Sequence, residues 1–345
     1  LFVLFLVLVW LCPGFATRPS RTLYTGSLAI AAMPAAILLV GLFEPGSSAT
    51  GILLFILLLA ALMAIAAALN RRLAAVAGLW LLGGALFLYD QAHGNALLQA
   101  SPLGYSPYAG ARYYGLGNEG FGLLIPAVLL GFTLAFERRQ ARAGRQTLMI
   151  AVLSFLLAAI IGENSLGANF GGALGAAAAG ITALYVALHR RLSRRALFGI
   201  ALAGCVLTLL PFIPEMLAGA DKQSHIGRAL SMLGSGGLGG VWDIMFRKLS
   251  MNLKLLRFSP WSRLLFAAGF TLVLLMRQRW EQLRAERPLL HVALVAMLGG
   301  ALGALVCNDS GVQPAAEMVS AAAAAVAYWR CEKGGTAANQ EGSLP

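Results

Sequence analysis

The stretch GILLFILLLAALMAIAAAL, residues 51–69, carries no charged side chain and is apolar on every face. A helix that crosses a bilayer needs about 20 predominantly apolar residues, and this stretch is close to that length. The strands of a membrane β-barrel would instead alternate polar and apolar residues. The stretch therefore predicts a membrane-spanning α-helix and excludes a barrel.

Comparable apolar stretches recur along the chain of 345 residues, of which 59% are hydrophobic and 12% charged. A soluble domain has about 25% charged residues, so this composition excludes a soluble cytosolic enzyme. We predict an all-α fold, a polytopic membrane bundle of about ten full transmembrane helices plus a truncated first one. The whole of residues 1–330 would form one transmembrane domain. The expected spans cover residues 1–12 (truncated), 27–43, 51–69, 73–89, 119–136, 147–161, 172–188, 196–213, 262–276, 289–306 and 314–330.

Basic residues indicate the orientation of these spans, because short cytoplasmic loops are enriched in Lys and Arg. The alternate loops on one side hold Arg18, Arg21, Arg71, Arg72, Arg138, Arg139, Arg142, Arg145, Arg190, Arg191, Arg194, Arg195, Arg277, Arg279, Arg284, Arg287, Arg330 and Lys333. We therefore predict a protein of the inner membrane with a cytoplasmic C-terminus. The polar residues 331–345 would form a disordered tail. The net charge of +12 then reflects topology, and no nucleic-acid partner is expected.

No pattern in the chain predicts a cofactor or a metal site. GLGNEG, residues 115–120, matches G-x-G-x-x-G, but it opens a membrane helix and does not follow a strand. Asp90, His93 and His225 lack the spacing of zinc ligands. The four cysteines are scattered, so neither a zinc site nor a disulfide framework is indicated.

Polar residues that are unusual in a membrane protein gather in three predicted outer connections, residues 90–118, 162–172 and 307–317. Each connection leads into a helix that runs from outside to inside. A charged side chain at the bilayer centre costs about 2.5–3.5 kcal/mol, so such residues usually have a function. We predict a substrate- or ion-binding site at interrupted or re-entrant helix starts, with the candidates Arg112, Asn118, Glu119, Glu163, Asn164, Asn169, Asn308, Asp309, Ser310, Gln313 and Glu317.

Several of these candidates also have a structural interpretation. Asn118, Asn169 and Asp309 are favourable N-cap residues. Ser310 and Gln313 fit the capping box Ser-x-x-Gln. Capping does not account for the carboxylates in the same connections, and both interpretations stay open.

The last span carries a polar stripe. On a helix that is continuous from Ser310, the residues Gln313, Glu317 and Ser320 fall on the same face. A polar stripe in a membrane helix faces other helices or water, and not lipid. It is therefore either a hydrogen-bonding seam between helices or the wall of a polar cavity open to the outside.

Glycines near the start of the span 172–188 have two interpretations as well. Gly167, Gly171 and Gly175 follow at a spacing of four, which lets helix backbones approach closely. Glycines at an interrupted helix start are also typical of the ion and substrate sites of transporters. The first interpretation makes these residues structural and the second makes them part of a site.

Residues 214–261 form a long outer loop that contains an amphipathic helix. The segment VWDIMFRKLSMNLKLLRF, residues 241–258, mixes apolar and basic side chains in the manner of a helix that lies in the headgroup layer. We expect membrane lipids as partners, with headgroup contacts from Arg247, Lys248, Lys254 and Arg257. Alternatively, Arg247, Lys248 and Lys254 bind the phosphate of a lipid-linked substrate.

Four blocks carry a family resemblance: GARYYGLGNEGFG, GANFGG, RKLSMNLKLL and NDSGVQPAA. With them, residues 100–320 resemble a family of bacterial multi-pass membrane proteins in which similar blocks recur in this order. Some members carry an upstream extracytoplasmic domain similar to the alkaline phosphatase and sulfatase superfamily. If the chain is a fragment of such a member, that domain precedes Leu1 on the outer side, and a first span that runs from outside to inside is consistent with this. It implies no particular activity.

Three functions are compatible with these observations. The first is transport or flipping of a small polar solute or a lipid-linked intermediate through an outward-facing polar site. The second is a membrane-embedded transferase or hydrolase, with Asp309 or Glu119 as general base and Arg112 among the phosphate ligands. The third is a scaffold for an extracytoplasmic enzyme domain. The inner halves of the spans are almost wholly apolar, which weighs mildly against transport.

Overall fold

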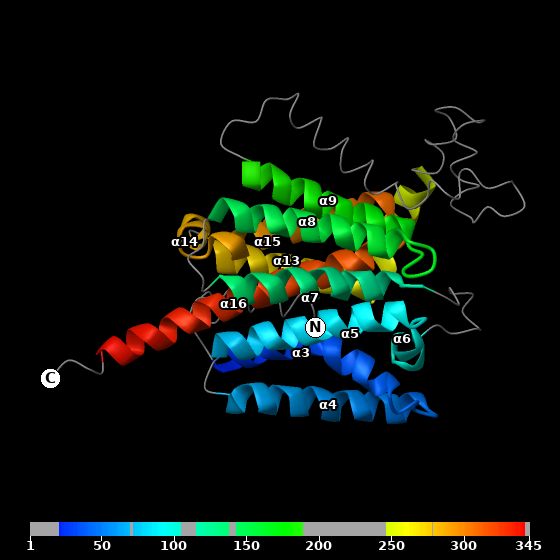
Figure 1. The fold of residues 1–345 in the computed structure, drawn as a ribbon, viewed down its shortest axis with the longest axis horizontal. Coiled ribbons are helices and arrows are strands. Elements are labelled where there is room, and N and C mark those ends of the chain that lie inside the picture. The colour runs from blue at the N-terminus through cyan, green and yellow to red at the C-terminus, as the bar shows by residue number, and fades with distance from the viewer. Residues whose placement is uncertain are drawn as a thin grey trace, which may run out of the picture.

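The computed structural model describes residues 21–69, 72–104, 115–137, 143–188, 246–277 and 279–341. Within these ranges every regular element is a helix, which confirms the all-α prediction for this part of the chain. Most of the helices lie side by side with roughly parallel axes (Figure 1). They are α3 (Arg21–Gly41), α4 (Ser48–Ala68), α5 (Arg72–Ala92), α6 (Ala96–Ala100), α7 (Asn118–Phe136), α8 (Ala143–Gly162), α9 (Phe170–Leu188), α13 (Pro260–Met276), α14 (Trp280–Glu286), α15 (Pro288–Cys307) and α16 (Val312–Glu341).

Five of the described helices are long and apolar enough to cross a membrane, namely α3, α4, α5, α7 and α15. A sixth candidate is the pair formed by α13 and the preceding helix Phe246–Phe258, which are bent by 81° relative to each other. The apolar parts of α8 and α9 are shorter. The described part of the chain thus shows five or six candidate spans and does not confirm the predicted ten or the re-entrant helix starts. The expected spans 1–12 and 196–213 lie outside the described residues.

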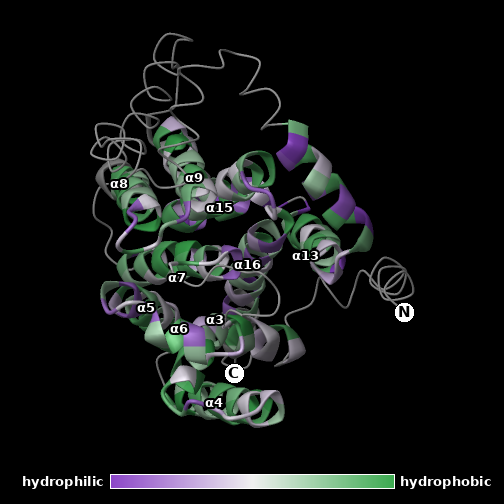
Figure 2. Ribbon diagram, turned by 90° about the vertical axis from the view of Figure 1, so that its right-hand side faces the viewer, coloured by the Kyte–Doolittle hydropathy of each residue, from purple (hydrophilic) through white to green (hydrophobic). Residues whose placement is uncertain are grey.

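Contacts among four of the long helices define the centre of the bundle. Helix α16 packs against α3, α7, α13 and α15, while α5 packs against α3 and α7. Helices α3, α5, α7 and α16 therefore form a ring (Figure 2). Between Val312 and Arg330 almost every residue of α16 is buried, because its many alanines allow close approach on all sides.

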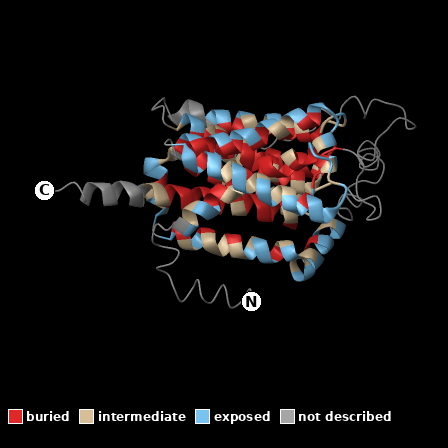
Figure 3. Ribbon diagram, turned by 90° about the horizontal axis from the view of Figure 1, so that it is seen from below, coloured by how far each residue is buried: buried red, intermediate tan, exposed pale blue. Residues whose placement is uncertain are grey.

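Helix α4 lies at the edge of the bundle, where it packs mainly on α3 (Figures 1 and 2). Of its residues only Gly51 and Ala66 are buried, and Ile52, Leu57 and Ile65 are more than half exposed. Figure 3 shows the same division, with buried residues inside the bundle and exposed residues on its outer faces. A helix that is apolar all round and exposed to this extent is typical of a lipid-facing position.

Glycines allow α9 and α15 to approach closely. A Cβ atom on Gly303 would lie 2.6 Å from Cβ of Ala178, and one on Gly175 would lie 3.5 Å from the carbonyl oxygen of Gly300. A Cβ on Gly171 would lie 2.8 Å from Nδ2 of Asn308. A side chain would therefore be too close at Gly171, whereas a Cβ on Gly175 would make ordinary van der Waals contact, and the close-approach interpretation is supported at Gly171 alone.

The ends of the helices are held together by contacts between distant parts of the sequence. At the end that we expect to be cytoplasmic, Arg287 forms a 2.7 Å ion pair with Glu332, and Arg330 donates to the Leu275 carbonyl at 3.4 Å. Helix α16 continues to Glu341 and thus through most of the predicted disordered tail. Glu332, in the first turn beyond the expected end of the span, has a partner on the neighbouring helix end.

Glu137 lies at this same end and caps a helix to which it does not belong. Its Oε1 atom accepts hydrogen bonds from the backbone N–H groups of Leu289 and Leu290, at 3.1 and 3.3 Å, in the first turn of α15. Burial raises the pKa of this carboxyl group from 4.5 to about 7, against the opposing effect of these N–H groups and of Arg287. Its Oε2 atom has no hydrogen-bond partner among the described residues, which is consistent with a bound proton.

The stability of the protein should depend on pH through Glu137. Because the folded-state pKa is the higher one, the contribution of this group is fully present below pH 4.5 and is lost as the pH rises towards 7. Glu137→Gln keeps the acceptor oxygen and removes the charge. We expect this substitution to raise the free energy of unfolding at pH 8 by about 3 kcal/mol at most. At pH 4.5 it should change the free energy of unfolding little.

Thermal unfolding in detergent between pH 4.5 and 8 measures this difference. Glu281→Gln is the control, because Glu281 is exposed at the same end of the bundle. A Glu137→Gln variant whose unfolding temperature followed that of the wild type at every pH would contradict the assignment.

Candidate functional site

The structure brings parts of all three predicted outer connections together. The described residues include every predicted site residue except Arg112, which lies outside the described ranges. The start of α7, the start of α9 and the turn between α15 and α16 meet through side-chain hydrogen bonds. The residues at this meeting point divide into an amide cluster and a pair of carboxylates.

Three asparagines, one from each connection, form the asparagine junction: Asn118, Asn169 and Asn308. The Oδ1 atom of Asn118 accepts from Nδ2 of Asn169 at 3.3 Å and from Nδ2 of Asn308 at 2.9 Å. Asn169 also donates to the Leu116 carbonyl at 2.9 Å. Buried amides that are bonded in this way stabilise a specific packing of helices.

Two of these asparagines also satisfy helix ends. Asn169 precedes α9, and its Oδ1 accepts the N–H of Gly172 at 2.8 Å, so the predicted N-cap is confirmed. Asn308 follows α15, and its Oδ1 accepts the N–H of Ser310 at 3.2 Å. The N-cap position of α7 is Gly117, so Asn118 is the first residue of that helix. The junction thus combines capping with contacts between helices.

The helix Phe246–Phe258 is anchored to the end of α15. Asn252, which is 2% exposed, donates through Nδ2 to the carbonyls of Leu305, at 2.9 Å, and Asn308. Lys248 donates through Nζ to the carbonyl of Cys307 at 2.6 Å. A cation at a helix C-terminus is favourable because the last carbonyls carry partial negative charge. Sequence reasoning missed Asn252, although it lies one helical turn after Lys248 on the same face.

The basic residues that we expected at lipid headgroups therefore have two different positions. The ammonium group of Lys248 is bound to the protein. The side chains of Arg247, Lys254 and Arg257 are exposed. Around them Phe246, Leu249, Leu253 and Phe258 are exposed too, each by half or more. An apolar and basic face thus points away from the bundle.

The carboxylates of Glu119 and Glu317 form the second part of the site, called here the carboxylate pair. Gln313 donates through Nε2 to Oε1 of Glu119 at 2.7 Å, and Glu317 follows Gln313 by one turn of α16. The two carboxyl groups lie close enough to interact electrostatically. Glu317 is 7% exposed, and its Oε2 atom has no hydrogen-bond partner in the described part of the chain.

Glu317 fits against α7 at a position where that helix has no side chain. A Cβ atom on Gly122 would collide with Oε2 of Glu317 and would lie 2.7 Å from Cα of Pro314. Gly122 is one turn after Glu119, so α7 presents a carboxylate and then a gap to the same face of α16. Gly122 is a close-packing position beside Glu317 that sequence reasoning missed.

The predicted polar stripe is present in part. Gln313 and Glu317 both face α7, whereas the hydroxyl of Ser320 donates to the Ala316 carbonyl of its own helix at 2.7 Å. Ser310 precedes α16, which begins at Val312. The side chain of Gln313 bonds to Glu119 and not back to Ser310, so the structure does not support the predicted capping box.

The remaining candidates lie at the margin. Glu163 and Asn164 are half-buried in the loop between α8 and α9, and Glu163 accepts from the Ser165 hydroxyl at 3.4 Å. Asp309 is exposed and Ser310 half-buried. Within the described residues none of these four side chains has a hydrogen bond to Glu119 or Glu317, so they are not part of the carboxylate pair.

Asp90 has a structural role at this end of the bundle. Its two carboxylate oxygens accept the N–H groups of Leu97 and Leu98 at 2.8 and 2.9 Å, in the first turn of α6. His93 stacks on Tyr89 with ring centroids 4.0 Å apart. Over the described ranges, no three His, Cys, Asp or Glu residues are grouped as a metal site would require.

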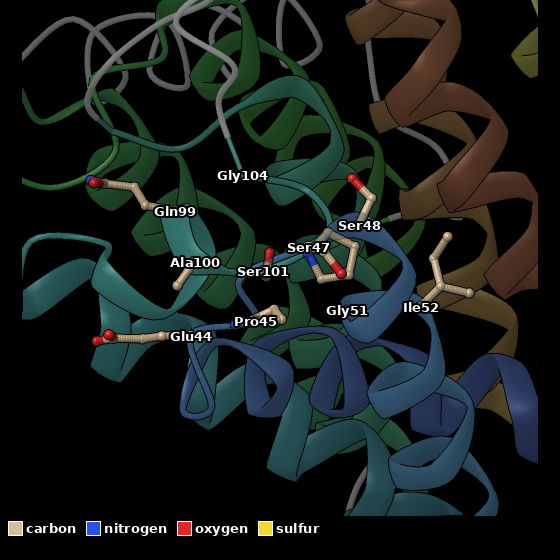
Figure 4. Close-up of a pocket in the computed structure, with 11 residues that line it drawn as sticks. Glu44, Pro45, Ser47, Ser48, Gly51, Ile52, Gln99, Ala100, Ser101 and Gly104 are labelled. Atoms are coloured by element: carbon tan, nitrogen blue, oxygen red, sulfur yellow. The ribbon is translucent and has the colours of Figure 1, made fainter.

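A cavity of about 630 Å³ lies between the α3–α4 turn and α6 (Figure 4). Several of its polar side chains are committed to local structure. The hydroxyl of Ser47 caps α4, that of Ser101 donates to the Leu98 carbonyl, and Gln99 donates to the Gly94 carbonyl. The cavity is separate from the carboxylate pair, since neither carboxylate lines it.

Comparisons of the chain with protein-family models, with curated proteins and with solved structures found no match. The family resemblance thus stays a prediction. Three of its blocks nevertheless meet in space, because Asn118, Asn169 and Asn308 come from residues 110–122, 167–172 and 308–316. The fourth block, residues 247–256, is joined to them through Asn252.

Proposed function

We propose that the protein is a multi-pass inner-membrane protein that moves a small polar solute or a lipid-linked intermediate across the bilayer. About ten spans and a cytoplasmic C-terminus belong to this proposal. It is supported by the exposed apolar surface of α4 and by the alternation of basic loops. The site would be the carboxylate pair, held at the outer end of the bundle.

The observation that carries the proposal is the buried Oε2 atom of Glu317, which has no partner among the described residues. A buried polar group without a hydrogen bond costs several kcal/mol, and an uncompensated buried charge costs more. Ionisable residues inside a membrane bundle that accept such a cost commonly line the path of a substrate or an ion. A structural role would have been served better by the alanines that surround Glu317.

The asparagine junction would act as the frame of this site. It fixes Asn118, next to Glu119, relative to Asn308, which precedes the α16 turn that carries Gln313. The exposed face of the helix Phe246–Phe258 would rest on the headgroup layer, with Arg247, Lys254 and Arg257 at phosphate level. Movement of that helix would reach the junction through Asn252.

Reconstitution into phospholipid vesicles tests the proposed function. One probe is a phospholipid with a fluorescent headgroup label. External dithionite bleaches only labelled lipid in the outer leaflet, so bleaching of the remaining label measures how fast the lipid crosses the bilayer. The other is uptake of radiolabelled zwitterionic amino acids. We expect wild-type protein to move one of the two probes, and Glu317→Ala to lose at least about tenfold in rate, the effect of removing roughly 1.4 kcal/mol.

Glu163→Ala is the matched control, because Glu163 lies at the outer margin and outside the pair. It should keep the wild-type rate. Wild-type vesicles that moved neither probe, or a Glu317→Ala variant that moved it at the wild-type rate, would overturn the proposal.

A scaffold for an extracytoplasmic domain is a second candidate, and the asparagine junction favours it. The amides of the junction bond to protein groups, as a structural seam requires. The scaffold function predicts that variants of the carboxylate pair fold normally and change no transport rate. The vesicle experiment therefore separates the two candidates.

A further inference from the structure

The helix Phe246–Phe258 runs across the bundle and not along it. It is bent by 81° relative to α13, which lies roughly parallel to the other long helices (Figure 1). Through Lys248 and Asn252 it is bound to backbone carbonyls at the C-terminal end of α15. If the bundle spans a membrane, this helix therefore lies nearly along the outer surface of the bilayer.

The two sides of this helix carry different side chains. Lys248 and Asn252, four residues apart, face α15. Arg247, Lys254 and Arg257, called here the basic face, follow at spacings of seven and three residues and therefore share one side. All three are exposed. The basic face thus points away from the end of α15.

The basic face has no acidic counterpart nearby in the sequence. Residues 246–280 contain no Asp or Glu. The two ion pairs found in the described part of the chain lie at the opposite end of the bundle, on α14 and between Arg287 and Glu332. An anionic partner from outside the protein would complement the basic face.

Exposed apolar side chains border the basic face. Phe246 is 66% exposed, Leu253 58% and Phe258 72%. Cations with apolar side chains beside them suit the headgroup layer, where the cations contact phosphate and the apolar groups reach the acyl chains. A dissolved phosphate ion would leave these apolar side chains in water. The surroundings of the basic face therefore favour a phospholipid over a free anion.

The spacing of the cations indicates how headgroups can bind. Lys254 and Arg257 are about 4.5 Å apart along the helix axis, so both can contact one phosphate group. Arg247 lies about 10 Å before Lys254 on the same axis, where a second phosphate group can bind. In a zwitterionic lipid the ammonium group offsets the charge of the phosphate. An anionic phospholipid has no such group and is attracted more strongly by clustered cations.

We propose that Arg247, Lys254 and Arg257 bind the phosphate groups of anionic phospholipids in the outer leaflet. The inference rests on the proposed function only in placing this end of the bundle at the outer membrane surface. It adds a preference for anionic lipid to the contact with headgroups in general. Because Asn252 donates to the carbonyl of Asn308, the bound lipid would be joined to the asparagine junction through this helix.

Fluorescence quenching at the basic face tests this inference. Ser250 is exposed between Arg247 and Lys254, so Ser250→Cys, in the full chain without its native cysteines, places a bimane label there. The protein is reconstituted into phosphatidylcholine vesicles that contain an increasing fraction of a lipid with a nitroxide near the top of its acyl chain. One series uses nitroxide-labelled phosphatidylglycerol and the other nitroxide-labelled phosphatidylcholine.

We expect half-maximal quenching at a mole fraction of phosphatidylglycerol at least about fivefold below that of phosphatidylcholine, which is the effect of one cation near an anionic surface. High salt should reduce this preference, because it screens exposed charges. The combined variant Arg247→Gln, Lys254→Gln and Arg257→Gln should abolish it. Arg247→Lys with Arg257→Lys keeps the charges and should retain it.

The matched control removes three exposed cations from the opposite end of the bundle. It combines Arg277→Gln, Arg279→Gln and Arg284→Gln, and it should leave the preference at position 250 unchanged. Equal quenching by the two lipids, or a preference that survives the three Gln substitutions in the basic face, would overturn the inference. Absence of quenching by either lipid would also overturn it, since protein or water would then cover the basic face.

The two proposals fail in different ways. Protein that prefers phosphatidylglycerol at position 250 but moves neither vesicle probe would leave the lipid site standing and overturn the transport function. Protein that moves a probe but is quenched equally by the two lipids would do the reverse.

Discussion

Asn308→Asp should lower the unfolding temperature of the protein strongly, whereas Asn118→Asp should change it little. Asn308 contributes a donor to the asparagine junction, because its Nδ2 atom bonds to Oδ1 of Asn118 at 2.9 Å. Aspartate at 308 would place an acceptor against that acceptor and a charge at a site that is 3% exposed. Aspartate at 118 would keep an oxygen that accepts from both partners.

The expected cost of Asn308→Asp is about 3 kcal/mol or more in the free energy of unfolding, from an unsatisfied buried acceptor and a buried charge. Thermal unfolding of both variants in one detergent, at one pH above 6, measures the difference. Equal losses in the two variants would show that the direction of these hydrogen bonds, and so the junction itself, is wrong.

Gly122→Ala should be the second large change. The added methyl group would collide with Oε2 of Glu317 and lie 2.7 Å from Cα of Pro314, so α7 and α16 would have to separate. Overpacking of this kind typically costs about 1–3 kcal/mol. Because it displaces Glu317, we also expect the transport rate to fall.

Gly78→Ala is the matched control for this substitution. Gly78 also lies inside a long helix, α5, and a Cβ atom there would meet nothing within 4 Å. Alanine should stabilise that helix by up to about 1 kcal/mol. If Gly122→Ala behaved like Gly78→Ala in thermal unfolding, the close approach of α7 and α16 would be contradicted.

The sequence was sufficient for the helical class and for identifying the polar residues that meet at the starts of α7, α9 and α16. Residues 51–69 have no polar face, so they can only form a buried or lipid-facing helix, and α4 matches them closely. The unusual residues Glu119, Asn169 and Glu317 stand out because a polar group in an apolar segment needs a reason. These inferences depend on local composition, which a sequence contains in full.

Partnerships between distant residues could not be predicted in this way. The capping-box pattern at Ser310 does not indicate that Gln313 bonds to Glu119. The amphipathic pattern of residues 241–258 likewise does not indicate that Lys248 and Asn252 bind the end of α15. Glu137 looks like an ordinary residue after a helix, yet it caps α15. Each contact depends on the register between helices, which a single sequence does not specify.

Single cysteines at four positions, in a background without the native cysteines, test the central claim most directly. A membrane-impermeant maleimide is applied to intact cells and then to permeabilised ones. Positions 165 and 309 are exposed at the predicted outer end, position 281 is exposed at the opposite end, and position 317 is buried near the outer end.

We predict that Ser165→Cys and Asp309→Cys react from outside, that Glu281→Cys reacts only after permeabilisation, and that Glu317→Cys reacts from outside but much more slowly than Asp309→Cys. This pattern would place a protein-enclosed carboxylate in the outer half of a membrane bundle. Labelling of Glu281→Cys in intact cells, or labelling of Glu317→Cys as fast as that of Asp309→Cys, would contradict the account.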